Sequence, residues 1–471
     1  MAAPCILSLV SLLLILRGME AYMLSRGSHL KGQRGGLFLR RIADRMTKYG
    51  KGLTACDESA GTIGVRFERV GIENSEENRR RYRQLLFETS AGPACLSGAI
   101  LDPETLFQNH ENGQSFPSFL KSRGISVGVK PHLKVAELPG TGGETVMQGL
   151  DSLADRLKEY KKAGAEFTKW RSPIKIDTRK GLPTALAIES NMRDLARFAL
   201  ISQMEGLVPI VEPDVLMEGD HDLRTARKVN EEIQSVLWRE CIKHGVDIQS
   251  TVLKTSLVLP GKNCKESFTV REIARQNLVA FANTVPPAMP GIVFLSGGQP
   301  FFDVAARLSA LNSEKPAFGV KHAPWQLSFS WSAALQLPVM ELCRGKEGEM
   351  PLDDMAKLYA QELKIASLAA RGKYNFDQGR GDHKGEGGGL IKGMQAESTR
   401  WRRRPQRKRK EKEQAKTPDP TTATAASSSS PEGGEGGVSP STSLSPQTEA
   451  DAEAAVRGET KSELETATSP S

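Results

Sequence analysis

Short apolar runs recur through the middle of this chain, and their number and spacing restrict its fold more than any other feature. Eight of them follow one another between Leu37 and Phe376, roughly every 30 to 43 residues. In order, they are GLTAC, ACLSGAIL, ISVGV, FTKWR, LVPIV, STVLK, GIVFLSG and QLSFSW. Runs of this length, rich in branched and aromatic side chains, are typical of buried strands.

The intervals between these runs show the periodicity of amphipathic helices. One interval has apolar residues at i, i+3, i+7 and i+10, namely Leu150, Leu153, Leu157 and Tyr160. Gly164 follows them as the expected C-cap. A second helix is predicted from Met192 to Glu205. Ser190 or Asn191 is its expected N-cap, and Gly206 ends it.

Eight parallel strands that alternate with helices close best into a (β/α)8 TIM barrel. We therefore predict one α/β domain of this kind over residues 37–376 of the 471-residue chain. An open, doubly wound sheet is the alternative arrangement of the same elements. In both folds ligands bind beyond the carboxyl ends of the strands, so candidate site residues are sought there.

Residues 1–36 have the composition of a signal peptide followed by a transit-like leader. An uncharged apolar run from Ile6 to Leu16 is long enough for a signal peptide and too short to span a bilayer. From Tyr22 to Ala43 there are five basic residues and no acidic one, as in transit peptides. This order indicates delivery through the secretory pathway to an organelle of plastid type. The alternative is an N-terminal extension without a targeting signal, in a cytoplasmic protein.

Residues 377–471 contain mainly Gly, Ser, Thr, Pro, Ala and charged side chains. Such a segment cannot bury enough surface to offset its conformational entropy, so we predict a disordered, low-complexity tail. Its basic block, residues 400–416, has ten Lys or Arg against two Glu, and an acidic stretch follows. RNA, an acidic surface or a nuclear import receptor would suit this block. A solvated tail is the simpler interpretation, and we predict no stable nucleic-acid partner.

The six cysteines indicate neither a disulfide framework nor a zinc site. None forms a C-x-x-C pair, and Cys5 lies in the leader. The seven histidines, among them His132, His221 and His244, show no ligand cluster. We therefore predict that the protein uses no metal and no cofactor.

One predicted strand has a lysine in its middle. In STVLKTSLV, Ser250 to Val258, Lys254 is surrounded by branched and aliphatic residues. Lysine is rarely buried without a partner or a function. In a water-poor site near a second cation, the pKa of an amine falls toward neutrality, and the amine can form a Schiff base with a ketone. The alternative is a lysine near a strand end whose ammonium group reaches solvent.

Polar residues follow the other predicted strands, where a barrel would bring them together around Lys254. They are Asp57, Glu58, Ser59, Lys130, Lys169, Arg171, Glu212, Asp214, Ser296, Gly297, Gly298 and Ser330. Each has a simpler interpretation by itself, for example Asp57 as a helix N-cap or Glu212 as part of a turn. Their common position at the strand ends favours a shared site.

Long segments of residues 37–376 resemble class I fructose-1,6-bisphosphate aldolases. They include TACDESAGTIG, IENSEENRRRYRQLLFET, FTKWRSPIKI, GLVPIVEPDVL, EGDHDL, TVLK, NTVPPAMPG, FLSGGQ and LAARGKYNF. The resemblance implies a TIM-barrel lyase that reversibly cleaves fructose 1,6-bisphosphate to dihydroxyacetone phosphate and glyceraldehyde 3-phosphate, in glycolysis and gluconeogenesis. Members of this family are usually homotetramers, which is also the expectation here.

The same resemblance implies roles for residues at the strand ends. Lys254, in TVLK, is similar to the Schiff-base lysine of the family. Glu212 matches the acid and base that removes water from the carbinolamine, and Asp57 matches the base for the C4 hydroxyl. Lys169 and Arg171, in FTKWR, resemble the residues that lie beside the lysine and orient the substrate. Lys169 is then the second cation that lowers the pKa of the reactive amine.

Two phosphate pockets are implied as well. One consists of Ser59, Thr62, Arg66 and Lys130, and the other of Ser296, Gly297 and Ser330. Hydroxyl groups, cations and backbone N–H groups are suitable ligands for phosphate.

The chain departs from the family pattern at phosphate-binding positions. The eighth strand usually ends in Ser-Tyr-Gly-Arg, but here it ends in Ser330-Trp331-Ser332-Ala333, without the arginine that binds the 1-phosphate. The basic residue usual before Arg66 is Val65. One charge-assisted contact contributes about 1.5 to 3 kcal/mol, so its loss would weaken binding roughly ten- to hundredfold. A catalytically weak, aldolase-like binding or scaffold protein is therefore the alternative to an active lyase.

Overall fold

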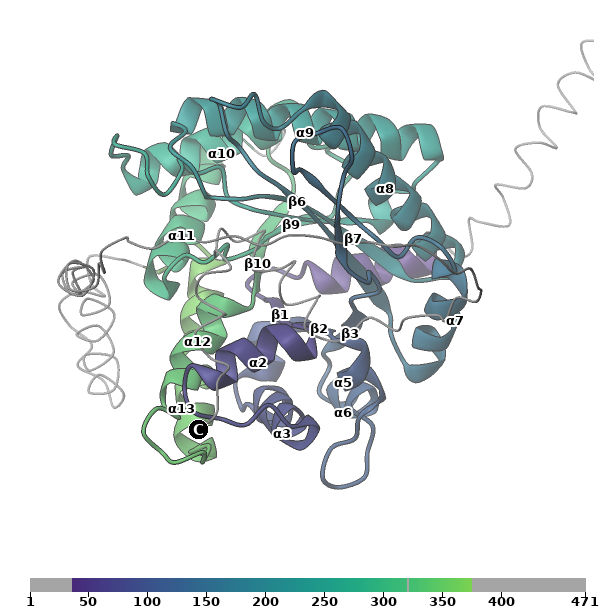
Figure 1. The fold of residues 1–471 in the computed structure, drawn as a ribbon, viewed down its shortest axis with the longest axis vertical. Coiled ribbons are helices and arrows are strands. Elements are labelled where there is room, and N and C mark those ends of the chain that lie inside the picture. The colour runs from purple at the N-terminus through teal and green to yellow at the C-terminus, as the bar shows by residue number, and fades with distance from the viewer. Residues whose placement is uncertain (1–35, 320–321, 375–471) are drawn as a thin grey trace, which may run out of the picture. The chain divides into compact units, whose positions relative to one another are not determined.

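The computed structural model describes residues 36–319 and 322–374, which form a barrel of eight parallel strands (Figure 1). The barrel strands are β1 (Gly52–Cys56), β2 (Leu96–Leu101), β3 (Ser126–Val129), β6 (Phe167–Ile174), β7 (Val208–Val215), β8 (Val252–Thr255), β9 (Gly291–Phe294) and β10 (Gln326–Trp331). Their order around the barrel is β1-β10-β9-β8-β7-β6-β3-β2, and β1 pairs with both β2 and β10. The TIM barrel predicted from the eight apolar runs is confirmed, and the open sheet is excluded because the sheet closes on itself.

Helices surround the strands and form the outer layer (Figure 1). They are α2 (Ala60–Glu68), α3 (Glu76–Glu88), α4 (Gly92–Cys95), α5 (Pro103–Phe107), α6 (Phe116–Ser122), α7 (Leu153–Ala163), α8 (Ala185–Met204), α9 (Leu223–His244), α10 (Val270–Thr284), α11 (Phe301–Phe318), α12 (Ala333–Glu341) and α13 (Leu352–Ala369). A short 3-10 helix, Ile248–Ser250, precedes β8. No helix in the described part of the chain is long and apolar enough to span a membrane.

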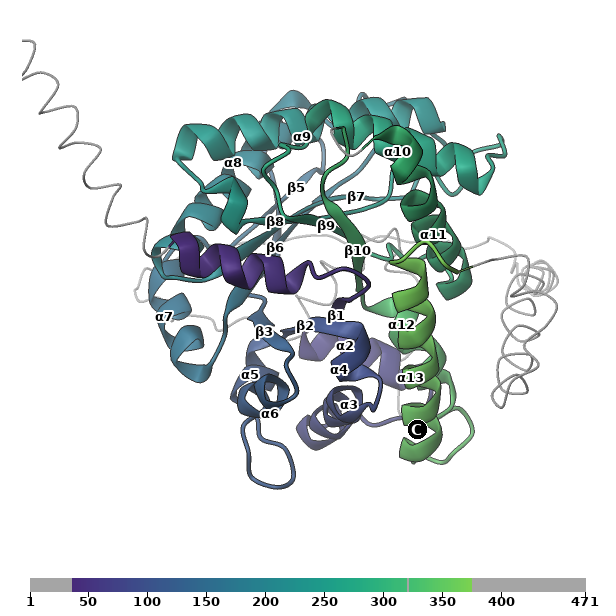
Figure 2. The ribbon, with the colours of Figure 1, turned by 180° about the vertical axis from the view of Figure 1, so that it is seen from behind.

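A helix over residues 36–46 packs against the amino-terminal ends of the barrel strands. Its buried residues Leu39, Ile42 and Met46 belong to one apolar cluster with residues that begin several strands, such as Leu53 and Val252. Figure 2 shows this helix, in purple, crossing the strands. Because this end of the barrel is filled with apolar side chains, solvent and ligands reach the interior from the opposite end.

The barrel interior depends on a large ring beside two glycines. Phe167 is fully buried at the start of β6, next to β3. A Cβ atom on Gly128 would lie 2.0 Å from the Phe167 ring, and one on Gly98 would lie 3.2 Å from it. Glycine is therefore required at position 128, since any side chain there would displace the ring.

The two helices predicted in detail are both present, with one boundary corrected. α7 ends at Gly164, whose φ of 115° suits glycine, as predicted. α8 begins after Thr184, whose hydroxyl accepts a hydrogen bond from Ala187 N, so the prediction of Ser190 or Asn191 as N-cap was wrong. Asn191 lies inside the helix, and its amide donates to the carbonyl of Thr145, a tertiary contact that the local sequence does not indicate.

A two-stranded antiparallel sheet, which the strand count did not anticipate, lies between β3 and β6 in the sequence. It consists of β4 (Val135–Glu137) and β5 (Thr145–Met147). The leader of residues 1–36 falls almost wholly outside the described residues, as does the tail of residues 377–471 with its basic block. Those predictions remain predictions.

Candidate active site

A pocket of about 310 Å³ opens at the carboxyl ends of the barrel strands. Eleven of the twelve residues predicted for the site line it: Asp57, Thr62, Arg66, Lys130, Lys169, Arg171, Glu212, Lys254, Ser296, Gly297 and Ser330. The exception is Ser59, whose hydroxyl accepts from Thr62 N and caps α2. The N-cap of α2 is therefore Ser59 and not Asp57, which was the simpler interpretation of Asp57 from the sequence. Asp57 lines the pocket instead.

Lys254 is buried in β8, where only 4% of it is exposed. Its Nζ lies 3.1 Å from Glu212 Oε1, which is itself buried in β7. The alternative of an ammonium group that reaches solvent is therefore excluded by its burial. The ion pair with Glu212 provides the partner that a buried lysine requires.

Lys169 joins the two carboxylates of the site. Its Nζ is 2.6 Å from Asp57 Oδ2 and 3.3 Å from Glu212 Oε2. Lys254, Glu212, Lys169 and Asp57 therefore form one continuous chain of buried ion pairs. Lys254, Glu212 and Lys169 lie on the neighbouring strands β8, β7 and β6. Asp57 follows β1, which lies across the mouth of the barrel from them.

Alternation along the strands explains why several polar residues face the pocket together. Lys169 and Arg171 are two residues apart on β6, so their side chains leave the same face. Glu212 and Asp214 have the same relation on β7, and Arg171 Nε donates to Asp214 Oδ2 at 2.8 Å. Arg171 pairs in register with Glu212 across the two strands. This arrangement places cations and carboxylates beside one another at a single level of the barrel.

The charges within this chain of ion pairs keep Asp57 and Lys169 ionised. Burial alone would raise the pKa of the Asp57 carboxyl, but the ammonium groups of Lys169, Lys254 and Lys130 outweigh it and hold the pKa well below its usual range. Burial alone would lower the pKa of Lys169, but Asp57 and Glu212 raise it above its usual range. Asp57 is thus a carboxylate at neutral pH, and Lys169 is an ammonium.

Groups suited to phosphate lie around this chain of ion pairs. Ser330 Oγ is buried, lines the pocket and has no hydrogen-bond partner among residues 36–319 and 322–374. Gly297 and Gly298 have φ of 57° and 74°, which glycine adopts easily and which directs the backbone of this turn toward the pocket. Lys130 Nζ is 3.2 Å from Asp102 Oδ2.

Arg66 lies on α2, one turn after Thr62, and its side chain reaches the end of β10. Its Nη1 donates to Glu58 Oε1 at 2.7 Å and to Ser332 Oγ at 3.2 Å. Ser332 follows β10, so Arg66 contacts this strand end and also lines the pocket with Thr62 and Lys130, the residues with which it was grouped. Contacts with β10 depend on the direction of a long arginine side chain, which no local pattern in the sequence specifies.

His132 was missed as a pocket residue. It is buried beside the Trp170 ring, and neither ring nitrogen has a hydrogen-bond partner in the described part of the chain. Burial and then the nearby cations, beginning with Lys169, lower the pKa of the His132 imidazole well below its usual range, so the ring is neutral. Its position two residues after Lys130, at a strand end, was the only signal for it in the sequence.

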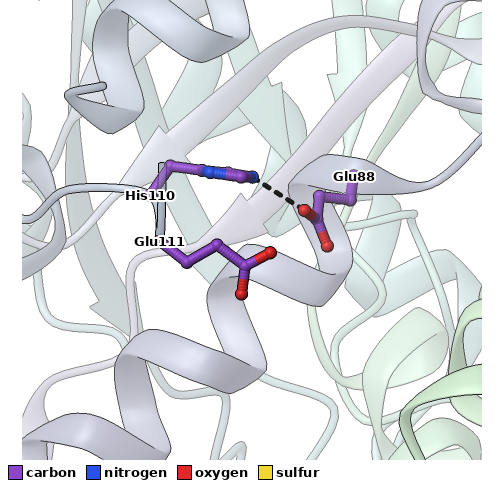
Figure 3. A group of neighbouring side chains, drawn as sticks. All are labelled: Glu88, His110 and Glu111. Carbon is purple, nitrogen blue, oxygen red and sulfur yellow. Dashed lines mark hydrogen bonds and ion pairs between the residues drawn. The ribbon is translucent and has the colours of Figure 1, made fainter. Parts of the chain in front are cut away.

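A second group of side chains resembles a metal site. Glu88, His110 and Glu111 have potential ligand atoms within 4.8 Å of one another, outside the barrel mouth (Figure 3). His110 Nδ1 accepts a hydrogen bond from Asn112 N, so in the neutral ring Nε2 has the hydrogen and donates to Glu88 Oε1 at 2.7 Å. This tautomer offers no lone pair at Nε2, and hydrogen bonding explains the group without a metal.

Comparisons with known proteins agree with the pocket. A family model described as fructose-bisphosphate aldolase class-I matches residues 38–388. Fructose-bisphosphate aldolase B of Gallus gallus is 42% identical over 338 residues, which are 71% of this chain and 90% of that protein. Fructose-bisphosphate aldolase C of Homo sapiens is 41% identical over 362 residues, or 76% and 94% of the two chains.

A solved structure is similar as well. It is fructose-bisphosphate aldolase from Plasmodium falciparum, in a ternary co-crystal with TRAP and a small-molecule inhibitor. Its TM-score is 0.69 at 38% identity, and the match covers 73% of this chain and 96% of that one. These matches span the whole barrel.

Proposed function

Because this chain belongs to the class I fructose-bisphosphate aldolase family, we propose that Lys254 is the residue that forms a Schiff base with the substrate ketone. The protein is a fructose-bisphosphate aldolase, a lyase whose substrate is a sugar phosphate. The observation that supports the assignment is the buried chain of ion pairs from Lys254 through Glu212 and Lys169 to Asp57.

The first step requires a nucleophile with a proton carrier beside it. Glu212 first takes a proton from the Lys254 ammonium group 3.1 Å away, which leaves a neutral amine. This amine attacks C2 of the ketose, and a proton moves from the nitrogen to the C2 oxygen, which becomes the hydroxyl of a carbinolamine. Glu212, 3.1 Å from Lys254 Nζ, then donates a proton to that hydroxyl, which leaves as water. The nitrogen lone pair forms the C=N bond, so the product is a protonated imine.

The second step breaks the carbon–carbon bond. The C3–C4 electron pair becomes the C2–C3 double bond, and the iminium nitrogen accepts the electrons of the C=N bond, which gives an enamine. Asp57 takes the proton of the C4 hydroxyl as the aldehyde forms, and its pKa, held low by Lys169, keeps it in the basic form. Protonation of the enamine at C3 and hydrolysis of the imine then release the second product.

Phosphate groups of the substrate are expected at the polar rim of the pocket. Ser296, Gly297 and Ser330 would bind the phosphate near C1, and the unpaired hydroxyl of Ser330 supports this assignment. Thr62 and Lys130 would bind the phosphate near C6. Lys169 and Arg171 would orient the carbon chain of the substrate between its two phosphates.

Reductive trapping tests the assignment of Lys254. The protein is incubated with dihydroxyacetone phosphate and sodium borohydride, digested, and analysed by mass spectrometry. We expect an adduct on the peptide that contains Lys254. Lys262 also lines the pocket but pairs with Glu218 at its mouth, so the Lys262→Met variant is the matched control and is expected to form the same adduct.

Two outcomes would refute this assignment. An adduct on a different lysine would move the Schiff base elsewhere. No adduct at any dihydroxyacetone phosphate concentration would favour the aldolase-like scaffold.

We also propose that the protein is a homotetramer, as is usual in its family. Large apolar side chains on α8 and α9 support an interface: Leu186, Met204 and Ile242 are 51%, 75% and 68% exposed. Light scattering after size exclusion would measure the mass in solution. A monomeric mass at micromolar concentration would contradict this proposal.

For localisation we propose an organelle of plastid type, reached through the secretory pathway. The support is the composition of residues 1–36, an apolar run followed by a basic, acid-free stretch. A fusion of these residues to a fluorescent protein, expressed in cells with a plastid of secondary origin, should label that organelle. Diffuse cytoplasmic fluorescence would support the alternative address.

A further inference from the structure

Ser332 occupies a helix N-cap but does not cap its helix. It precedes α12, and its side chain makes no hydrogen bond to the first turn. Serine is favoured at this position because its hydroxyl usually accepts from a backbone N–H of that turn. Here Ser332 Oγ instead donates to Glu58 Oε1 and accepts from Arg66 Nη1. The hydroxyl is therefore used to connect the end of β10 to α2 and the β1 loop.

This connection holds the Arg66 guanidinium in a defined position. Nη1 makes both contacts, to Glu58 and to Ser332, and Glu58 is itself fixed by Arg83, which donates to the Glu58 carbonyl at 2.8 Å. Burial alone would raise the pKa of the Glu58 carboxyl, but Arg66 and Arg83 hold it below its usual range, so it remains a carboxylate. The side chains of Arg66 and Glu58 are 10% and 5% exposed, so water screens the pair weakly.

The remaining donors of Arg66 are available to an anion. Nε and Nη2 have no hydrogen-bond partner within residues 36–319 and 322–374, and the residue lines the pocket. Ser330, whose hydroxyl is also unpaired, lies two residues before Ser332 on the same strand. Arg66 is thus a cation brought to the β10 end of the pocket, next to Ala333, where the sequence has no arginine of its own.

We propose that Ser332 is a positioning residue that directs Arg66 to the phosphate bound at Ser330. This inference rests on the proposed function of Lys254. The phosphate concerned is that of the dihydroxyacetone phosphate half, because one carbon separates its oxygen from the C2 atom attached to Lys254. Around the barrel, β9 and β10 follow β8 directly, so this phosphate reaches Ser296 and Ser330.

The proposal differs from the grouping that the sequence suggested. If Arg66 served the other phosphate with Thr62 and Lys130, loss of the Ser332 hydroxyl would weaken binding of glyceraldehyde 3-phosphate. If it serves the phosphate at Ser330, the same loss weakens binding of dihydroxyacetone phosphate. The two ligands therefore separate the two arrangements.

The first experiment compares Ser332→Ala and Ser332→Thr with the unaltered protein. Half-saturation by dihydroxyacetone phosphate is measured by borohydride trapping, and KM for glyceraldehyde 3-phosphate is measured in the condensation direction. In Ser332→Ala we expect the half-saturating concentration to rise about two- to tenfold, the effect of one lost hydrogen bond. The KM for glyceraldehyde 3-phosphate and the yield of adduct at saturation should not change.

Ser332→Thr retains the hydroxyl and should restore the half-saturation of the unaltered protein, which a purely structural role of Ser332 would not require. A change confined to glyceraldehyde 3-phosphate, or no change with either ligand, would overturn the proposal. Failure of the proposed function would look different, since the unaltered protein would then form no adduct on Lys254.

A second experiment uses Ala333→Arg in two backgrounds. If Arg66 already serves this phosphate, the new arginine should lower the half-saturating concentration of dihydroxyacetone phosphate less than about threefold in the unaltered protein. In the Arg66→Met background it should lower it about tenfold or more, as one recovered charge-assisted contact would. An equal tenfold gain in both backgrounds would show that the two arginines act independently and would refute the proposal.

Discussion

Lys169 and Lys254 are both buried lysines of the same pocket, yet their loss should have different consequences for folding. Lys169 is the direct ion partner of Asp57 at 2.6 Å and also contacts Glu212 at 3.3 Å. Lys254 contacts only Glu212, at 3.1 Å, among the described carboxylates. Lys254→Met therefore leaves each carboxylate with Lys169, whereas Lys169→Met leaves Asp57 without a direct partner.

The magnitude follows from the cost of an unpaired buried charge. Removing one member of a buried pair destabilises a protein by about 3 to 5 kcal/mol, so we expect Lys169→Met to lower the free energy of unfolding by about that amount. Lys254→Met should cost at least about 2 kcal/mol less, because methionine fills a similar volume and no carboxylate loses its last partner. Urea unfolding of both variants, at pH 7 and equal protein concentration, measures the difference.

The same pair of variants separates folding from chemistry. Lys254→Met should abolish both cleavage and borohydride trapping while the barrel remains folded. Lys169→Met should raise the pKa of Asp57, so the acid limb of its residual turnover should move to higher pH, since Asp57 must be ionised to accept a proton. Equal destabilisation by the two substitutions, or unchanged turnover in Lys254→Met, would refute the reasoning.

Three further predictions concern other parts of the chain. Asp57→Asn and Glu212→Gln should each lower kcat about 10²- to 10⁴-fold in the cleavage assay, the usual contribution of a positioned acid or base, and a loss under about threefold would place that role elsewhere. Burial without a cation raises the pKa of the Glu362 carboxyl well above its usual range. Above the pKa that Glu362 has in the unfolded chain, the carboxylate must therefore take up a proton when the protein folds, which lowers the free energy of unfolding. Glu362→Gln should then raise the free energy of unfolding by about 1 kcal/mol or more at pH 8 and by less at pH 5, and an advantage independent of pH would contradict this. Removal of residues 377–471 should leave the melting temperature unchanged, because that segment has little apolar surface, and a large drop in calorimetry would show that it packs on the barrel.

The eight strands were predictable because each buried strand corresponds to a short apolar run in the sequence. Each apolar run, including the one around Lys254, lies at a barrel strand of the structure. The sequence also placed Lys169 and Arg171 at the end of one strand, and the alternation of side chains along β6 explains why both face the pocket. Closure into a barrel was favoured by the count of strands, but only the pairing of β1 with β10 decided it.

Boundaries and contacts between distant residues were less predictable. The start of α8 was misplaced because the local sequence makes Ser190 and Asn191 plausible N-caps. The Asn191 amide instead donates a hydrogen bond to the carbonyl of Thr145, 46 residues away in the sequence. His132 was missed because its position after Lys130 was its only signal in the sequence, and its burial beside Trp170 is a tertiary contact.

Sequence alone determined which residue types stand at the strand ends, and therefore the fold and the chemistry that they permit. Tertiary structure decided which of them meet. Arg66 Nη1 donates to Ser332 Oγ across 266 residues, a contact between α2 and the end of β10 that the sequence did not indicate. The reason is physical: periodicity is set by the backbone within one element, whereas the partner of a long side chain depends on how separate elements pack against each other.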